Sequence, residues 1–188
     1  MPLWSEVNPT DIKLNGWKGR MMCLDGPIRF QIPEARVPFG VSVFNSKKDI
    51  QLEMIDPEWK SWISTLEAHV CQLLSDDAMN VFSTEKSASE VMDLWKSNYR
   101  DDKLRVKLDD CSFWDSDNQP LDPPENIERW LARSRASALV EVRNIYFFNG
   151  TVGLVWKAKQ VKILENNAPK LAWAGTQDSQ IPKGTCLL

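Results

Sequence analysis

Residues 139–164 read LVEVRNIYFF-NG-TVGLVWKAKQVKIL, and they carry the strongest local structural signal in the chain. The first ten residues are rich in β-branched and aromatic side chains, which favour strands. Asn149-Gly150 is the preferred dipeptide of a two-residue type I′ turn, which joins antiparallel strands. The residues after the turn return as a second long apolar run. The stretch therefore predicts a long β-hairpin with strands at 139–148 and 151–164.

The two-residue turn also predicts the register of this hairpin. Three pairs of facing residues follow: Phe148 with Thr151, Tyr146 with Gly153, and Arg143 with Trp156. Side chains alternate between the two faces of a strand, so one face carries aromatic and basic residues: Tyr146, Phe148, Lys157 and Lys159. The other face carries a set suited to a core: Ile145, Phe147, Val152, Leu154 and Trp156. Arg143 falls on this apolar face, where a charge is unfavourable.

The rest of the chain combines short strands with amphipathic helices. Alternation of apolar and polar residues predicts strands at 28–32, 41–44, 50–54 and 103–108. Helical spacing and capping signals predict three helices, at about 56–75, 87–98 and 122–132. Their start signals are Asp56-Pro57, the capping box from Ser87 to Glu90, and Asp122-Pro123.

These elements show no alternating strand–helix rhythm, so a parallel sheet is not expected. They favour a mainly β domain over 27–164, a small antiparallel barrel with two or three peripheral helices as insertions. We expect residues 1–26 to form a loosely ordered N-terminal extension and residues 165–188 to form a flexible tail.

The composition argues against an enzyme and against secretion. The 188 residues include a single histidine, His69, and contain neither a nucleophile elbow nor a phosphate-binding glycine loop. The cysteines lie far apart in the sequence, which does not fit a zinc site and favours an intracellular, reducing compartment. We therefore expect no catalytic residues, no metal and no cofactor. The sequence has no signal-peptide pattern and no run of ~20 apolar residues, so neither export nor membrane insertion is expected.

Candidate binding residues come from the strands. A net charge of −3 does not indicate nucleic-acid binding, so that function needs a local basic surface. Lys103, Arg105 and Lys107 share one face of the strand at 103–108, and nine tryptophans offer stacking surfaces. A basic face is also what an ordinary solvated strand presents, and Tyr146 and Phe148 fit equally well beneath the helices. Both interpretations stay open at this stage.

Three stretches of the sequence resemble a known family. They are IRFQIPEARVPFGVS at 28–42, WDSDNQPL at 114–121, and the final glycine-turn hairpin. In this combination they resemble the OB-fold single-stranded DNA-binding proteins of DNA bacteriophages and large eukaryotic DNA viruses. The resemblance implies a five-stranded OB-like barrel with a basic, aromatic-lined groove. It implies binding of single-stranded DNA without sequence reading, in support of viral replication or recombination.

The resemblance also implies which residues bind. The candidates are the basic strand and the hairpin: Lys103, Arg105, Lys107, Arg143, Tyr146, Phe148, Trp156, Lys157 and Lys159. The expected partners are single-stranded DNA or RNA, a second copy of the chain, and replication proteins in the host cytoplasm or nucleus. Phage members end in an acidic tail, whereas residues 165–188 hold only Glu165 and Asp178 as acids. The alternative hypothesis is a non-enzymatic protein-interaction or virion structural module.

Overall fold

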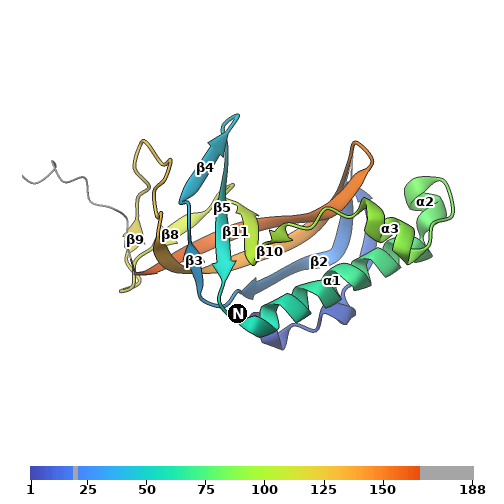
Figure 1. Ribbon diagram of the computed structural model, residues 1–188, viewed down its shortest axis with the longest axis horizontal. Coiled ribbons are helices and arrows are strands. Elements are labelled where there is room, and N and C mark those ends of the chain that lie inside the picture. The colour runs from blue at the N-terminus through green and yellow to red at the C-terminus, as the bar shows by residue number, and fades with distance from the viewer. Residues whose placement is uncertain (19–20, 166–188) are drawn as a thin grey trace, which may run out of the picture.

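The predicted hairpin is present and forms the longest part of the sheet. The computed structural model describes residues 1–18 and 21–165. Strands β10 (Ser134–Phe148) and β11 (Thr151–Glu165) pair antiparallel along the whole hairpin (Figure 1). Asn149 and Gly150 join them with φ angles of 48° and 71°. Both angles are positive, as a type I′ turn requires, which is why this dipeptide stands at the turn.

The register of the hairpin is as predicted near the turn and differs farther from it. Two predicted pairs are present, Phe148 with Thr151 and Tyr146 with Gly153. Between Val142 and Asn144 the register shifts, and Trp156 pairs with Val142. Arg143 is the extra residue of this β-bulge, and it is exposed. The predicted pairing of Arg143 with Trp156 is therefore wrong, because the bulge moves the charge off the apolar face and leaves Trp156 on it.

Five strands close into a barrel. Going round the ring, β10 is followed by β3 (Ala35–Val37), β5 (Lys47–Met54), β7 (Lys103–Lys107) and β11, which pairs with β10 again. The β7–β11 contact is parallel and the other four are antiparallel. The expected fold, mainly β with an OB-like five-stranded barrel, is confirmed.

The remaining strands extend this barrel. The hairpin of β1 (Leu14–Lys18) and β2 (Met21–Gln31) continues the sheet beyond β10. β4 (Val41–Phe44) forms a hairpin with β5, and β6 (Tyr99–Arg100) pairs with β7. β8 (Ser112–Trp114) lies beside β11 and pairs with β9 (Pro120–Leu121).

The N-terminal segment belongs to the fold, so the expectation of a loosely ordered extension over 1–26 is wrong where the structure describes it. Two 3-10 turns, η1 (Trp4–Glu6) and η2 (Pro9–Asp11), precede β1. Trp4 is buried, with its ring centroid 5.5 Å from that of Trp59 and 6.1 Å from that of Trp62. Burial of this ring anchors the segment. The tail predicted over 165–188 lies, apart from Glu165, outside the described residues.

Two of the three expected helices are present. α1 (Pro57–Asp76) begins where predicted, and the Asp56 carboxylate accepts a hydrogen bond from the Glu58 backbone N–H at 2.9 Å. Its apolar face packs into the core. Figure 1 shows the helix running along β2. α3 (Ala88–Leu94) begins with the predicted capping box of Ser87 and Glu90. A short helix that was not expected, α2 (Ala78–Phe82), lies between them.

The prediction of a third helix, over 122–132, is wrong. This segment forms turns, in which Arg129 and Leu131 have φ angles of 59° and 68°. Left-handed residues interrupt a right-handed helix. The backbone instead bonds to the start of β4, where Val41 donates to the Trp130 carbonyl and accepts from the Arg129 N–H. Strand contacts from a distant part of the chain therefore outweigh the local helical pattern.

Candidate nucleic-acid interface

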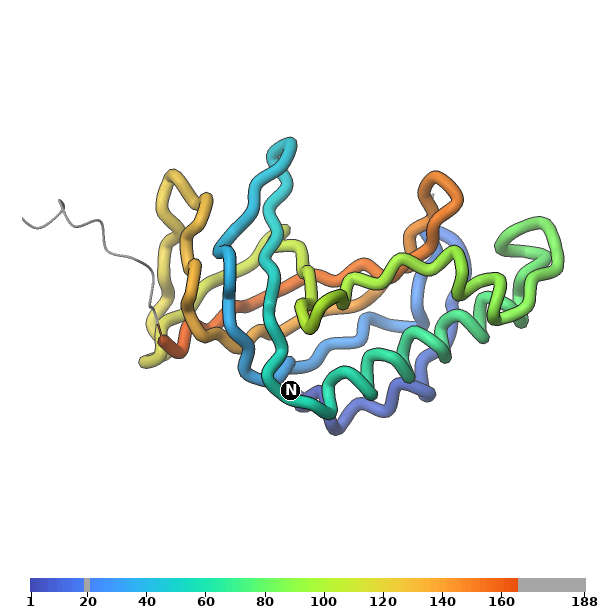
Figure 2. Tube along the Cα trace, in the orientation of Figure 1, coloured from blue at the N-terminus to red at the C-terminus, as the bar shows by residue number. Residues whose placement is uncertain are grey.

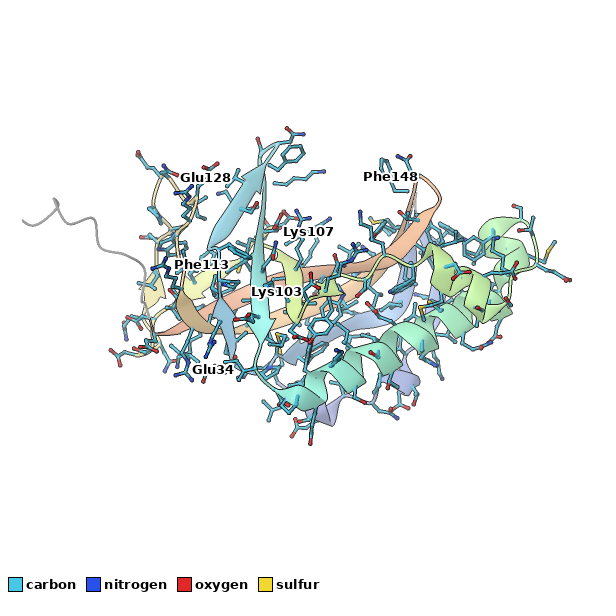
Figure 3. The ribbon with its side chains drawn as sticks, viewed as in Figure 1. Glu34, Lys103, Lys107, Phe113, Glu128 and Phe148 are labelled. Atoms are coloured by element: carbon cyan, nitrogen blue, oxygen red, sulfur yellow. The ribbon has the colours of Figure 1, made fainter. Side chains whose placement is uncertain are left out.

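A cleft of about 340 Å³ opens between two hairpin tips on one side of the barrel. Figure 2 shows the β4–β5 and β10–β11 turns projecting on the same side of the molecule. Strand β7 and the segment before β6 supply more of the lining, and Figure 3 shows Lys107 between the two hairpins. The lining residues are Phe44, Lys47, Lys48, Asp49, Lys96, Asn98, Arg105, Lys107, Tyr146, Phe148, Leu154, Val155 and Trp156.

Each hairpin tip presents an exposed phenylalanine to this cleft. Phe44, the last residue of β4, is 70% exposed, and Phe148, the last residue of β10, is 69% exposed. Single exposed apolar residues are common, but two rings beside one basic cleft form a distinct arrangement. Such rings are the usual platforms on which unpaired bases stack. The interpretation that Phe148 packs beneath the helices is therefore wrong.

The cleft carries a surplus of positive charge. Five cations, Lys47, Lys48, Lys96, Arg105 and Lys107, stand against one carboxylate, that of Asp49. Within the described residues, none of the four lysines forms an ion pair. On a chain whose net charge is −3, this is a local basic surface of the kind that phosphate binding needs.

Arg105 is held in position by the single acid. Its Nη2 donates to Asp49 Oδ2 at 2.6 Å, and the Asp49 side chain is nearly buried. This hydrogen bond raises the pKa of the Arg105 guanidinium above its usual value. A guanidinium has five N–H donors, so the donors that Asp49 does not engage can still contact a phosphate. Arg105 is therefore a fixed cation, whereas the neighbouring lysines are free to adjust.

One wall of the cleft depends on a glycine. A Cβ added to Gly153 would lie 2.7 Å from the Lys96 carbonyl oxygen and 2.8 Å from both Cε1 and the hydroxyl oxygen of Tyr146. The segment after α3 is bonded here to β11, with the Lys96 N–H donating to the Val152 carbonyl at 2.7 Å. The half-buried Tyr146 ring packs over the glycine, and burial raises the pKa of its phenol. Only glycine allows both groups to approach β11 this closely.

We therefore expect Gly153→Ala to destabilise the fold by about 2 kcal/mol, because the backbone oxygen of Lys96 cannot move aside without breaking its neighbouring hydrogen bond. The measurement is the midpoint of urea unfolding. Gln160→Ala, an exposed change on the same strand, is the control and should leave the midpoint unchanged. Equal midpoints for Gly153→Ala and the natural chain would show that this close approach does not exist.

The structure divides the nine predicted site residues into groups. Arg105, Lys107, Tyr146 and Phe148 meet in the cleft. Lys103 lies on the same face of β7 but outside the cleft, and its Nζ donates to the Asp101 carbonyl oxygen. Another three line a neighbouring cleft: Arg143, Lys157 and Lys159.

Trp156 is a core residue, and its choice as a binding residue is wrong. It is 1% exposed, although its segment of β11 borders the cleft. Its ring centroid lies 6.1 Å from that of Phe30 and 6.3 Å from that of Trp59. Trp156 shares the inward face of β11 with Val152 and Leu154, as alternation predicts, so no base can stack on its ring.

The residues that the prediction missed come from the β4–β5 hairpin and from the segment after α3. Phe44, Lys47 and Lys48 surround a tight turn in the sequence, and an aromatic residue beside a lysine pair was a signal that could have been used. Lys96 follows a short helix and gave no signal, because only the hydrogen bond to Val152 brings it to the cleft.

Other kinds of site find no support in the described residues. No group of three or more His, Cys, Asp or Glu side chains there could hold a metal ion. The acids near Asp115 form a turn, in which Asp115 Oδ1 accepts from the N–H groups of Asp117 and Gln119. Of the described helices, none has both the length and the apolar character that crossing a membrane demands.

Comparisons with known proteins locate the likeness in the fold. No protein-family model and no curated protein sequence matches the chain. Among solved structures, gp2.5, a single-stranded DNA-binding protein encoded by bacteriophage T7, superimposes with a TM-score of 0.51 at 10% identity, covering 80% of this chain and 97% of that one.

Two structures of the single-stranded DNA-binding protein from bacteriophage Enc34 also match. The C-terminal truncation has a TM-score of 0.49 at 12% identity, covering 84% of this chain and 98% of that one. The complex with single-stranded DNA has a TM-score of 0.48 at 10% identity, and the match covers 84% of this chain and 97% of that one. At such identities a likeness concerns the fold alone. The resemblance expected from the sequence is thus confirmed at that level: the chain is similar in fold to the single-stranded DNA-binding protein of bacteriophage T7.

Proposed function

We propose that this protein binds single-stranded DNA without reading its sequence, in support of viral DNA replication or recombination. The observation that carries the proposal is the cleft between the hairpin tips, with an exposed phenylalanine on each tip and five cations along its lining. The strand face and hairpin loops around it are those with which OB folds bind oligonucleotides. The role is binding and not catalysis.

The geometry supports a division of labour within the cleft. Bases stack on Phe44 and Phe148, each stack contributing about 1–3 kcal/mol. The cations contact the phosphates between and beside these bases. Stacking requires base faces that a duplex hides, so single strands are favoured over double strands.

The lining offers little for reading base edges. The Asn98 amide, which could read a base, donates instead to the Leu154 carbonyl at 2.6 Å. Arg105 is committed in part to Asp49. The lysines act as point charges, which suit phosphates better than base edges. Binding is therefore expected to vary little with base sequence.

The proposal predicts tight but salt-sensitive binding of a short oligo-dT of about six nucleotides. Each contacted phosphate contributes about −0.7 to the slope of log affinity against log salt for single strands. The five cations of the cleft therefore set a limit of about −3.5 for that slope. Fluorescence anisotropy of a labelled oligonucleotide, at several salt concentrations, measures the affinity and its dependence on salt.

Duplex DNA and RNA of equal length are the comparison ligands in the same titration. Duplex DNA should bind much more weakly, because its base faces are covered. If labelled oligo-dT does not bind even at low salt, DNA binding is excluded, and the alternative of a protein-interaction or virion structural module takes its place.

A further inference from the structure

A second basic cleft, of about 440 Å³, lies on the outer face of β1, β2, β10 and β11. Its cations are Lys18, Arg143, Lys157 and Lys159, and Glu141 is its acid. Lys18 comes from the end of β1, and Arg143 is the bulged residue of β10. Residues distant in sequence thus bring a second group of positive charges to one place.

This second cleft adjoins the one between the hairpin tips. Val155 lines both of them. Lys107 of the first cleft and Lys157 of the second are paired where β7 meets β11. A ligand that leaves the first cleft along this face therefore passes directly into the second.

The positive charge of the second cleft is only weakly compensated. Glu141 is 8% exposed in its side chain and is bound mainly by Arg29, whose Nε donates to Oε2 at 2.7 Å. The Nζ of Lys159 is 4.0 Å from Oε1 of the same acid, and that of Lys157 is 3.5 Å from Asp109 Oδ2. Such long, partly exposed contacts hold lysines weakly.

Arg143 reaches the second cleft because it is the bulged residue of β10. Without the bulge it would lie on the inward face beside Trp156, and with it the side chain is exposed. Among the described residues it forms no ion pair. Bulges commonly redirect a side chain next to a binding site.

An exposed ring lies at the far end of this surface. Trp17 is 46% exposed and borders a depression that shares Lys18 and Arg143 with the second cleft. Its ring centroid lies 4.9 Å from that of Phe147, which supports it from one side. The exposed part of the indole offers a platform for one further base.

We propose that the second cleft binds the continuation of the same DNA strand, holding its phosphates after the bases in the first cleft have stacked. The inference rests on the proposed function and deepens it, because it assigns the DNA strand a two-part path: the first cleft and then the second, across β11 and β10. A short oligonucleotide fills the first cleft alone, and only a longer one reaches Arg143 and Lys159.

The experiment compares oligo-dT of about six and about sixteen nucleotides on the full chain. The tested variant is Arg143→Ala/Lys159→Ala. The control variant, Lys13→Ala/Lys60→Ala, removes the same charge from exposed positions outside both clefts. For the long strand, the tested variant should lose about tenfold in affinity, and its salt slope should fall by about 1.4, the value for two lost phosphate contacts. Its affinity for the short strand should match that of the control.

A second readout uses the natural chain and does not depend on any variant folding. Cys23 is half-buried and lines the second cleft, so the long oligonucleotide should protect it from alkylation while the short one should not. Cys71 is an internal reference, because its side chain is buried in the core and burial raises the pKa of its thiol to about 12, so its labelling is slow in every sample. Mass spectrometry of the two cysteine peptides measures the protection.

The possible results separate the two proposals. Loss of long-strand affinity alone, with protection of Cys23, supports the two-part path. Unchanged long-strand affinity in the tested variant, or an unprotected Cys23, overturns the path and leaves the first cleft as the binding site. Equal weakening for both lengths also overturns it, because the clefts would then act as one site. If the natural chain binds neither length, the proposed function fails and the path fails with it.

Discussion

Replacing Phe44 and Phe148 together with alanine should lower the affinity for short oligo-dT by about 2–6 kcal/mol, at least thirtyfold. Both rings are exposed and line the same cleft, so each can stack on a base. Little of the fold depends on them, because exposed side chains at hairpin tips contribute little to packing. The loss should therefore appear in binding, measured by anisotropy, and not in the urea unfolding midpoint.

A matched control is available for this double variant. Phe39 is 62% exposed but does not line the cleft, so Phe39→Ala should bind like the natural chain. Replacing Phe44 and Phe148 with tryptophan keeps two stacking surfaces and should retain the affinity. Natural affinity in the double alanine variant would remove the stacking role from both rings.

Trp156→Ala should destabilise the protein by about 3–5 kcal/mol, the usual loss for a large buried aromatic side chain. The ring is buried against Phe30 and Trp59 in the barrel interior, and its removal leaves a cavity that the closed sheet cannot fill. The measurement is the urea unfolding midpoint at constant slope.

A milder change separates stability from binding at this position. Trp156→Phe keeps an aromatic ring in the core and should lower stability less, while affinity for oligo-dT stays unchanged at a temperature where the variant is folded. Trp17→Phe, at a half-exposed tryptophan, is the comparison for stability and should shift the midpoint little. Weaker DNA binding by Trp156→Phe with unaltered stability would place the ring in the interface and contradict its burial.

Local signals predicted the elements that depend on neighbouring residues. The Asn149-Gly150 turn needs two positive φ angles, which few other dipeptides accept, so the long hairpin and its register near the turn were predictable. The start of α1 at Asp56 and the capping box of α3 were predictable for the same reason, since each involves bonds within three residues.

Elements that depend on distant contacts were not predictable in this way. Residues 122–132 have a helical pattern and a start signal, yet their backbone bonds to Val41, at the start of β4. The N-terminal segment contains three glycines, Gly16, Gly19 and Gly26, but Trp4 is buried against Trp59 and Trp62 of α1. In both cases tertiary contacts outweighed the local preference. These contacts join residues far apart in the chain, so no short stretch of sequence predicts them.

The same division holds for the candidate interface. Alternation along β7 and β10 predicted that Arg105, Lys107, Tyr146 and Phe148 face outward, because which face a side chain occupies follows from its position in a strand. The family resemblance then implied that they bind, and all four line the cleft. Closure of the barrel decided that Phe44 and Phe148, about a hundred residues apart in the chain, stand beside one cleft. A single inserted residue in β10 decided that Arg143 faces outward, although the regular strand pattern placed it on the apolar face. Strand pattern reports which face a residue occupies, but proximity between strands is set by ring closure and bulges, which exist only once the sheet is assembled.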